Sequence, residues 1–211
     1  MLSGSACSTG GSGSNGAADR TTTSVGQGIS TTVESTVVSS STAIPGGDPA
    51  LESLILTTVP SGLQRQPDNV ADSGPVDLAK AIQDEVASDA AETLRTAGFL
   101  SGYQRTWADA TQLEENVVFL YRFASATGAA RYASHRLSEF ATSSTGTSFT
   151  PFLVFLPSAG GLQVEGPTSS VAVVVFSKGV YSVEAVSTSG THSDQSPIAA
   201  ALAVAQYRRI P

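Results

Sequence analysis

The first 46 residues of the chain contain few of the side chains from which a hydrophobic core is built. Ser, Thr and Gly dominate this segment, no leucine occurs between Leu2 and Leu51, and the first aromatic residue of the whole chain is Phe99. Such a segment cannot bury enough apolar surface to offset a backbone ordering cost of about 1–2 kcal/mol per residue. We therefore predict a disordered Ser/Gly/Thr-rich tether over residues 1–46 and one globular domain over residues 47–211.

The single cysteine of the chain, Cys7, lies near the start of this tether. Residues 2–7, Leu-Ser-Gly-Ser-Ala-Cys, resemble the lipidation site of bacterial lipoproteins, in which a small residue precedes the modified cysteine and a Ser/Gly-rich stretch follows it. Gly4 departs from that pattern, which has an aliphatic residue there, and the six residues before Cys7 contain no basic and apolar signal-peptide regions. The resemblance implies export by a signal peptide, an extracytoplasmic location and a membrane anchor at Cys7. The alternative is an incidental cysteine in a flexible tail.

The charge and composition of the chain exclude several classes of function. The formal net charge is −7, and only two lysines are present, so we do not expect a cationic surface for nucleic acid. One cysteine cannot form an internal disulfide or a cysteine-based zinc site. No apolar run approaches the roughly 18–20 residues that span a bilayer. We predict no metal site and no cofactor.

Hydrophobic periodicity in residues 47–211 predicts both helices and strands. Apolar residues recur every three or four positions from Leu78 to Ala97, which predicts a helix that could break near Ser88, and a second helix is expected over about 128–140. The acidic side chains of the first helix fall largely opposite its apolar stripe and are expected to face solvent. These acidic residues are Asp84, Glu85, Asp89 and Glu92.

The strand signals are strongest in the second half of the domain. Residues 116–125 carry apolar side chains on both faces, which is typical of a central strand covered on both sides. Two β-branched runs, 170–177 and 180–188, flank Lys178-Gly179 and predict a hairpin. Ser196-Pro197 opens a last helix, with the expected apolar stripe Ile198, Ala201, Leu202 and Ala205. This order of elements predicts the α+β class: a single domain with a mostly antiparallel sheet packed by about three helices.

Four segments are similar to stretches of actinobacterial cell-envelope lipoproteins and related extracytoplasmic sensor-like domains. They are LILTTVPSGLQ, GFLSGYQRTW, VVVFSKGVYSVEAVS and SPIAAALAVAQYRRIP. The resemblance is diffuse, spans about residues 51–211 and contains no catalytic signature. It implies a location outside the cytoplasm and a sandwich of the PsbP/Mog1-like kind, but no particular chemistry.

The two histidines offer little for catalysis. His135 is expected on the polar side of the 128–140 helix, beside Arg131 and Arg136, as an exposed residue. His192, with Asp194 two positions later, could belong to a Ser-His-Asp triad. The chain contains no Gly-x-Ser-x-Gly segment, so we predict no catalytic residues and keep a weak hydrolase that uses His192 only as an alternative.

Aromatic residues provide the remaining candidate site. Six of them occur within 25 positions: Phe99, Tyr103, Trp107, Phe119, Tyr121 and Phe123. The simplest interpretation is that they belong to the hydrophobic core. The functional interpretation is a pocket wall between sheet and helix for an apolar or amphipathic ligand.

The sequence therefore favours a non-catalytic cell-envelope lipoprotein domain, anchored to the membrane at Cys7, that binds a small apolar ligand or an envelope protein. The alternatives are the hydrolase and a scaffold or sensory ectodomain. An aromatic-lined cavity would favour binding, and Ser, His and carboxylate groups that meet in a cleft would favour the hydrolase. An exposed apolar patch of a few hundred Å² would favour the scaffold.

Overall fold

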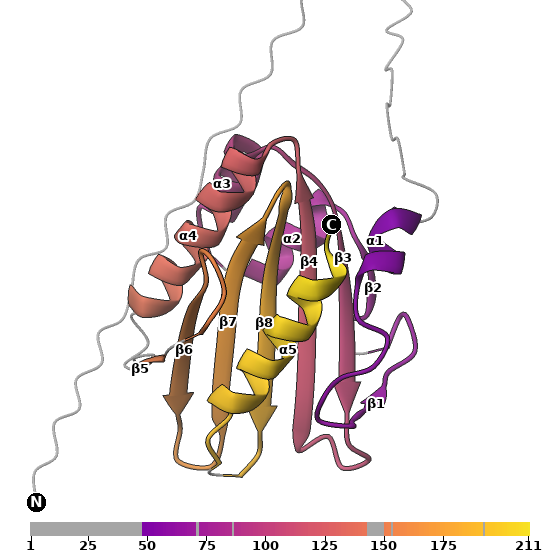
Figure 1. Ribbon diagram of the computed structural model, residues 1–211, viewed down its shortest axis with the longest axis vertical. Helices are drawn as coiled ribbons and strands as arrows, with labels where there is room; N and C mark the ends of the chain where they lie inside the picture. Colours follow the sequence, from indigo (N-terminus) through magenta and orange to yellow (C-terminus); the bar gives the residue numbers. More distant parts are fainter. Residues whose placement is uncertain (1–47, 71, 86, 143–149, 153, 192) are drawn as a thin grey trace, which may run out of the picture. The chain divides into compact units, whose positions relative to one another are not determined.

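The computed structural model describes residues 48–211, with the exception of residues 71, 86, 143–149, 153 and 192 (Figure 1). In this part of the chain eight strands form one antiparallel sheet, and five helices cover its two faces. The predicted α+β class with a mostly antiparallel sheet is confirmed. The proposed tether and Cys7 lie outside the described residues, so both remain predictions.

The sheet runs in the order β1-β3-β4-β8-β7-β6-β5, and β2 pairs with β3 beside this path. The strands are β1 (Gln64–Arg65), β2 (Gly74–Val76), β3 (Phe99–Ala108), β4 (Glu114–Phe123), β5 (Thr150–Phe152), β6 (Gly160–Glu165), β7 (Ser170–Lys178) and β8 (Tyr181–Ser189). Strand β4 lies between β3 and β8, with Val118 and Leu120 packed on one face and Phe119 and Tyr121 on the other. The central strand covered on both sides is therefore confirmed.

The helices form two layers, one on each face of the sheet. Helices α1 (Pro49–Leu54) and α5 (Ser196–Arg209) cover one face, and Figure 1 shows α5 lying across the front of β7 and β8. Helices α2 (Leu78–Glu85), α3 (Ala90–Ala97) and α4 (Ala126–Thr142) cover the other face. The five helices exceed the expected three because α1 forms and because the periodic stretch 78–97 breaks between α2 and α3, at the position that the sequence suggested.

The buried stripe of α5 is rotated relative to the prediction. Ala201 is exposed, and the residues of α5 that the fold buries are Ala199, Leu202, Ala203 and Gln206. Gln206 is buried because its side-chain amide accepts a hydrogen bond from the Leu56 N–H at 2.9 Å and donates one to the Leu54 carbonyl at 3.1 Å. The amide thus pairs with backbone groups at the end of α1, where the Leu54 carbonyl also accepts a hydrogen bond from Arg209 Nε at 3.1 Å.

Strands β7 and β8 form the predicted hairpin, with its turn one residue later than expected. Lys178 pairs with Tyr181, so Gly179 and Val180 are the central residues, and Gly179 has a φ of +56°. The Lys178 ammonium donates hydrogen bonds to two carbonyls at the C-terminal end of α5, at 3.3 and 2.6 Å. A cation at that position complements the free carbonyls of the helix end.

Candidate ligand site

The sheet divides the six aromatic residues singled out in the sequence between its two faces. Tyr103 and Trp107 belong to the layer under α1 and α5. The other four belong to the layer under α2, α3 and α4, where they make edge-to-face contacts: Phe99, Phe119, Tyr121 and Phe123. A single pocket wall that contains all six is therefore excluded.

A cavity of about 200 Å³ lies between α2, α4 and the strands β4 and β8. Two of the six aromatic residues, Phe119 and Tyr121, line it. The other lining residues are Asp84, Glu85, Tyr132, Arg136, Phe140, Glu184 and Val186. Because three carboxylates and a guanidinium accompany the aromatic rings, the cavity is amphipathic rather than apolar.

Arg136 and Glu184 form a buried ion pair in this cavity. Each side chain is 8% exposed, and Arg136 Nε lies 2.6 Å from one carboxylate oxygen of Glu184 while Nη2 lies 3.3 Å from the other. The third guanidinium nitrogen, Nη1, donates to Glu139 Oε2 at 2.6 Å. Burial alone lowers the pKa of Arg136, but the two carboxylates raise it by more, so the side chain stays cationic. The expectation that Arg136 lies on the exposed side of its helix is wrong.

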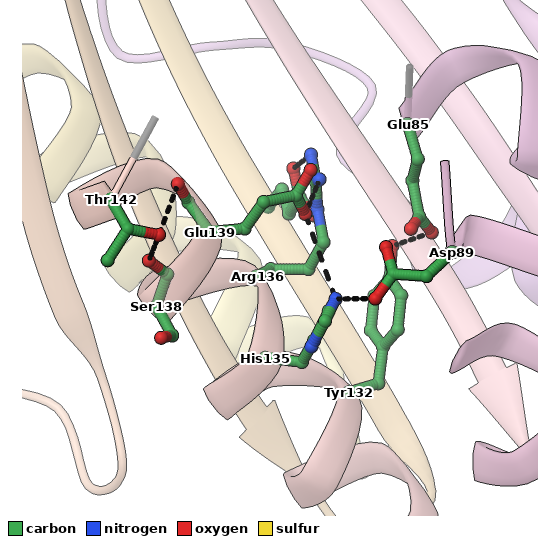
Figure 2. Close-up of polar contacts among 9 residues, drawn as sticks. Glu85, Asp89, Tyr132, His135, Arg136, Ser138, Glu139 and Thr142 are labelled. Carbon is green, nitrogen blue, oxygen red and sulfur yellow. Dashed lines mark hydrogen bonds and ion pairs between the residues drawn. The ribbon is translucent and has the colours of Figure 1, made fainter. Parts of the chain in front are cut away.

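Glu85, the last residue of α2, is also buried, contrary to the expected solvated acidic face. Only 5% of the residue is exposed. Its Oε1 accepts a hydrogen bond from the Tyr132 hydroxyl at 2.7 Å, whereas its Oε2 is buried and has no hydrogen-bond partner among the described residues. Figure 2 shows Glu85 reaching from α2 toward α4. Burial raises the pKa of Glu85 to about 7, against the Tyr132 hydrogen bond and the Arg136 charge, which lower it.

The third carboxylate of the cavity, Asp84, is neutralised within its own helix. Lys80 Nζ lies 2.8 and 2.9 Å from the two carboxylate oxygens of Asp84, and it also donates to Gln104 Oε1 at 3.1 Å. Asp84 and Glu184 therefore each have a cationic partner. Glu85 is the lining carboxylate for which the described residues provide no ion pair.

His135 lies outside this cavity, although it immediately precedes Arg136 in α4. Its Nε2 lies 3.8 Å from Asp89 and 4.0 Å from Glu139 (Figure 2). Its side chain is 31% exposed, so it is partly buried, whereas the sequence predicts an exposed residue. It borders a second hollow, of about 370 Å³, between α3 and α4. In the described part of the chain, no group of three His, Cys, Asp or Glu side chains is arranged to hold a metal ion.

The hydrolase alternative depends on His192, which lies outside the described residues. Its candidate partner Asp194 accepts hydrogen bonds from the backbone N–H and the hydroxyl of Ser196, at 2.9 and 2.6 Å. These bonds lower the pKa of the Asp194 carboxyl. They also place Asp194 at the start of α5, where its carboxylate and Gln163 Oε1 share the Ser196 N–H.

Sequence reasoning missed the polar residues of the cavity, Glu85, Arg136 and Glu184. Two sequence signals pointed to Glu184 and Arg136, and none pointed to Glu85. Glu184 interrupts the apolar run Val183–Val186 of a strand, and Arg136 follows Tyr132 at helical spacing on the side that carries Ala129 and Ala133. Each signal places a charge on a face that the surrounding residues bury.

Comparisons with known proteins show the fold and not the chemistry of the site. No protein-family model matches the sequence, and no curated protein matches it. Among solved structures, the chain is similar to the extracellular domain of PknH from Mycobacterium tuberculosis, with a TM-score of 0.53 and 12% sequence identity. The similarity covers 78% of this chain and 98% of the PknH domain chain. The α+β arrangement described above is thus shared with an extracellular domain.

Proposed function

We propose that the chain is a non-catalytic domain outside the cytoplasm that binds a small ligand in the cavity between α2 and α4. The observation that carries the proposal is the buried Oε2 of Glu85, an acceptor without a partner on a side chain that lines the cavity. An unsatisfied buried acceptor costs about 1–3 kcal/mol, and more when it is charged. A ligand that donates a hydrogen bond to Oε2 recovers this cost.

The proposed location has two independent supports. Residues 2–7 resemble a lipoprotein site, which favours an anchor at Cys7. The fold is similar to that of the extracellular domain of a mycobacterial protein, which agrees with the resemblance of the sequence to actinobacterial sensor-like domains. The tether that the sequence predicts over residues 1–46 would have a root-mean-square span near 35 Å and would hold the domain away from the membrane surface. No helix among the described residues has the length and apolar character needed to cross a bilayer.

A ligand site is better supported than a scaffold surface. The large apolar side chains exposed in the described part of the chain are Val70, Leu100, Leu113 and Phe155. They lie on four separate segments: the loop before β2, the start of β3, the β3–β4 turn and the loop between β5 and β6. A scaffold is expected to present a contiguous patch of several such side chains.

The test is a fragment screen of the full chain by two-dimensional amide NMR. Cationic, neutral and anionic fragments of about the size of benzene are suitable, because an engineered cavity of about 150 Å³ holds benzene. We expect at least one class to shift amides at the end of α2, in α4 and in β8. Val186→Phe, which adds a ring to the cavity, should abolish these shifts, whereas Val171→Phe, on β7 and away from the cavity, should retain them. Shifts that appear elsewhere, or no shifts at all, would refute the proposal.

A further inference from the structure

We infer that the ligand of this cavity carries a primary ammonium group, which supplies the cation that Glu85 lacks. This inference rests on the proposed function and specifies its ligand. It follows from the charge balance of the lining, from the hydrogen-bond state of Glu85 and from the size of the cavity.

The charge balance favours a cation over an anion. Of the three lining carboxylates, Asp84 is paired with Lys80 and Glu184 with Arg136. Glu85 has only the neutral Tyr132 hydroxyl as a partner. Arg136 already pairs with two carboxylates, Glu184 and Glu139. The acidic side chains in and around the cavity therefore outnumber the cations, and an anionic ligand would be repelled. A buried carboxylate is stable only when it is paired and hydrogen-bonded.

The hydrogen-bond state of Glu85 favours a primary ammonium over a quaternary one. Oε2 is an acceptor without a donor, and a quaternary ammonium has no N–H to give it. The rest of the lining is aromatic and suits the carbon atoms of the ligand next to its ammonium group. The ring centroids of Phe119 and Tyr121 lie 6.3 Å apart at an interplanar angle of 78°, and those of Tyr121 and Tyr132 lie 5.8 Å apart at 43°. Aromatic faces attract cations, as Arg136 over the ring of Phe140 at 4.5 Å illustrates within the same site.

The size of the cavity limits the ligand to a small amine or to the aminoalkyl end of a larger molecule. Its volume of about 200 Å³ is below the roughly 300–1,000 Å³ of sites for drug-sized ligands. Benzylamine is a suitable probe, since it adds one aminomethyl group to a ring that fits a cavity of about 150 Å³.

Binding of an ammonium should depend on pH. Burial raises the pKa of Glu85 to about 7, so the carboxyl must lose its proton to accept the cation, and affinity should rise between about pH 6 and pH 8. The other charged or titratable groups that face Glu85 are Lys80 and Asp84 from α2, Tyr121 from β4, Tyr132, Arg136 and Glu139 from α4, and Glu184 from β8. Asp84 is paired with Lys80, and Glu139 and Glu184 share Arg136, which leaves Glu85 as the carboxylate without an ion pair and the group that we expect to change charge on binding.

The experiment compares four probes on the full chain by NMR titration at about pH 8. The probes are benzylamine, benzyl alcohol, benzyltrimethylammonium and phenylacetate. We expect benzylamine to bind most tightly, and Glu85→Gln to weaken its binding about 10- to 100-fold, as the loss of a charge-assisted hydrogen bond implies. Glu52→Gln, the same substitution at an exposed position of α1, should leave the affinity unchanged.

The outcomes separate this inference from the proposed function. If benzyl alcohol or phenylacetate binds in the cavity as tightly as benzylamine, the ligand site stands and the ammonium assignment fails. Equal affinity of benzylamine for the wild-type chain and for Glu85→Gln also overturns the assignment, as does tighter binding of benzyltrimethylammonium. If no probe of any charge shifts the cavity amides, both the inference and the proposed function fail.

Discussion

Replacing Glu85 by glutamine should stabilise the folded state at neutral pH and leave it nearly unchanged in acid. Glutamine has the size of glutamic acid and matches its neutral, protonated form. In the folded chain the pKa of Glu85 is about 7, whereas the ordinary value is 4.5. The folded state therefore binds the proton more tightly than the unfolded state, and the resulting stabilisation is complete below about pH 4.5 and is lost as the pH rises through about 7.

The magnitude follows from the difference between the two pKa values. Each unit corresponds to about 1.4 kcal/mol, so ionisation of Glu85 reduces the free energy of unfolding by about 3 kcal/mol between pH 4.5 and pH 8. The glutamine variant does not incur this loss. It retains an oxygen that accepts from Tyr132 in place of Oε1, and its amide nitrogen takes the position of the unpartnered Oε2.

The assay is urea unfolding of the wild type, Glu85→Gln and the control Glu52→Gln at about pH 5, 6, 7 and 8. Differences between variants at each pH cancel the titration of all other groups. The free-energy difference between Glu85→Gln and the wild type should grow in favour of the variant by about 2–3 kcal/mol from pH 5 to pH 8, and the control should show a constant difference. Parallel pH profiles for the wild type and Glu85→Gln would show that Glu85 titrates normally, and the argument from its burial would then be refuted.

Three further substitutions test other parts of the structure. Gly128→Ala should lower the free energy of unfolding by about 1–3 kcal/mol, because an added Cβ would lie 2.0 Å from a carbonyl oxygen at the end of α3. Gly166→Ala, whose closest contact would be 3.3 Å, should cost much less in the same denaturation assay. Equal costs would contradict the close approach of α3 and α4. Arg136→Met should lower the free energy of unfolding by about 3–5 kcal/mol, because it leaves Glu184 buried without its cation. The double variant Arg136→Met/Glu184→Leu should recover most of that loss. A double variant as unstable as the single one would show that the pair acts through packing. Cys7→Ser in the full precursor should move the protein from the membrane fraction to the soluble fraction, since each buried lipid CH₂ contributes about 0.8 kcal/mol to membrane binding. An unchanged distribution between the two fractions would contradict the proposed anchor at Cys7.

The parts of the fold that the sequence predicts well are those that local chemistry determines. The β7–β8 hairpin follows from two β-branched runs around a glycine, and the Lys178 pairing moves its turn by only one residue. The central position of β4 follows from apolar side chains on both of its faces. In contrast, the buried stripe of α5 differs from the predicted one, since it includes Gln206, which forms hydrogen bonds to the end of α1, some 150 positions earlier in the sequence. Hydrophobic periodicity carries no information about such a contact.

The candidate site could be predicted only in part from the sequence, for the same reason. Glu85 looks like one member of a solvated acidic face, and its burial depends on α4 packing over the end of α2. The spacing of Arg136 from Tyr132 places it on the buried side of α4, but its partner Glu184 comes from a strand 48 positions later and cannot be predicted from that spacing. Of the six aromatic residues that the sequence groups into one pocket wall, Phe119 and Tyr121 line the cavity. The sequence could not show that the sheet separates them from Tyr103 and Trp107.

The energetics of the cavity distinguish a binding site from a structural polar cluster. A buried ion pair such as Arg136–Glu184 is often no more stabilising than apolar residues of similar volume, and an ionised Glu85 without a cation is a direct cost to folding. If Glu85 served only the fold, its replacement by glutamine would be favourable at neutral pH, with nothing lost. If Glu85 is the acceptor for an ammonium ligand, the same substitution raises the stability of the free protein and weakens benzylamine binding. One variant therefore yields two measurements of opposite sign, and only a ligand-binding carboxylate predicts both.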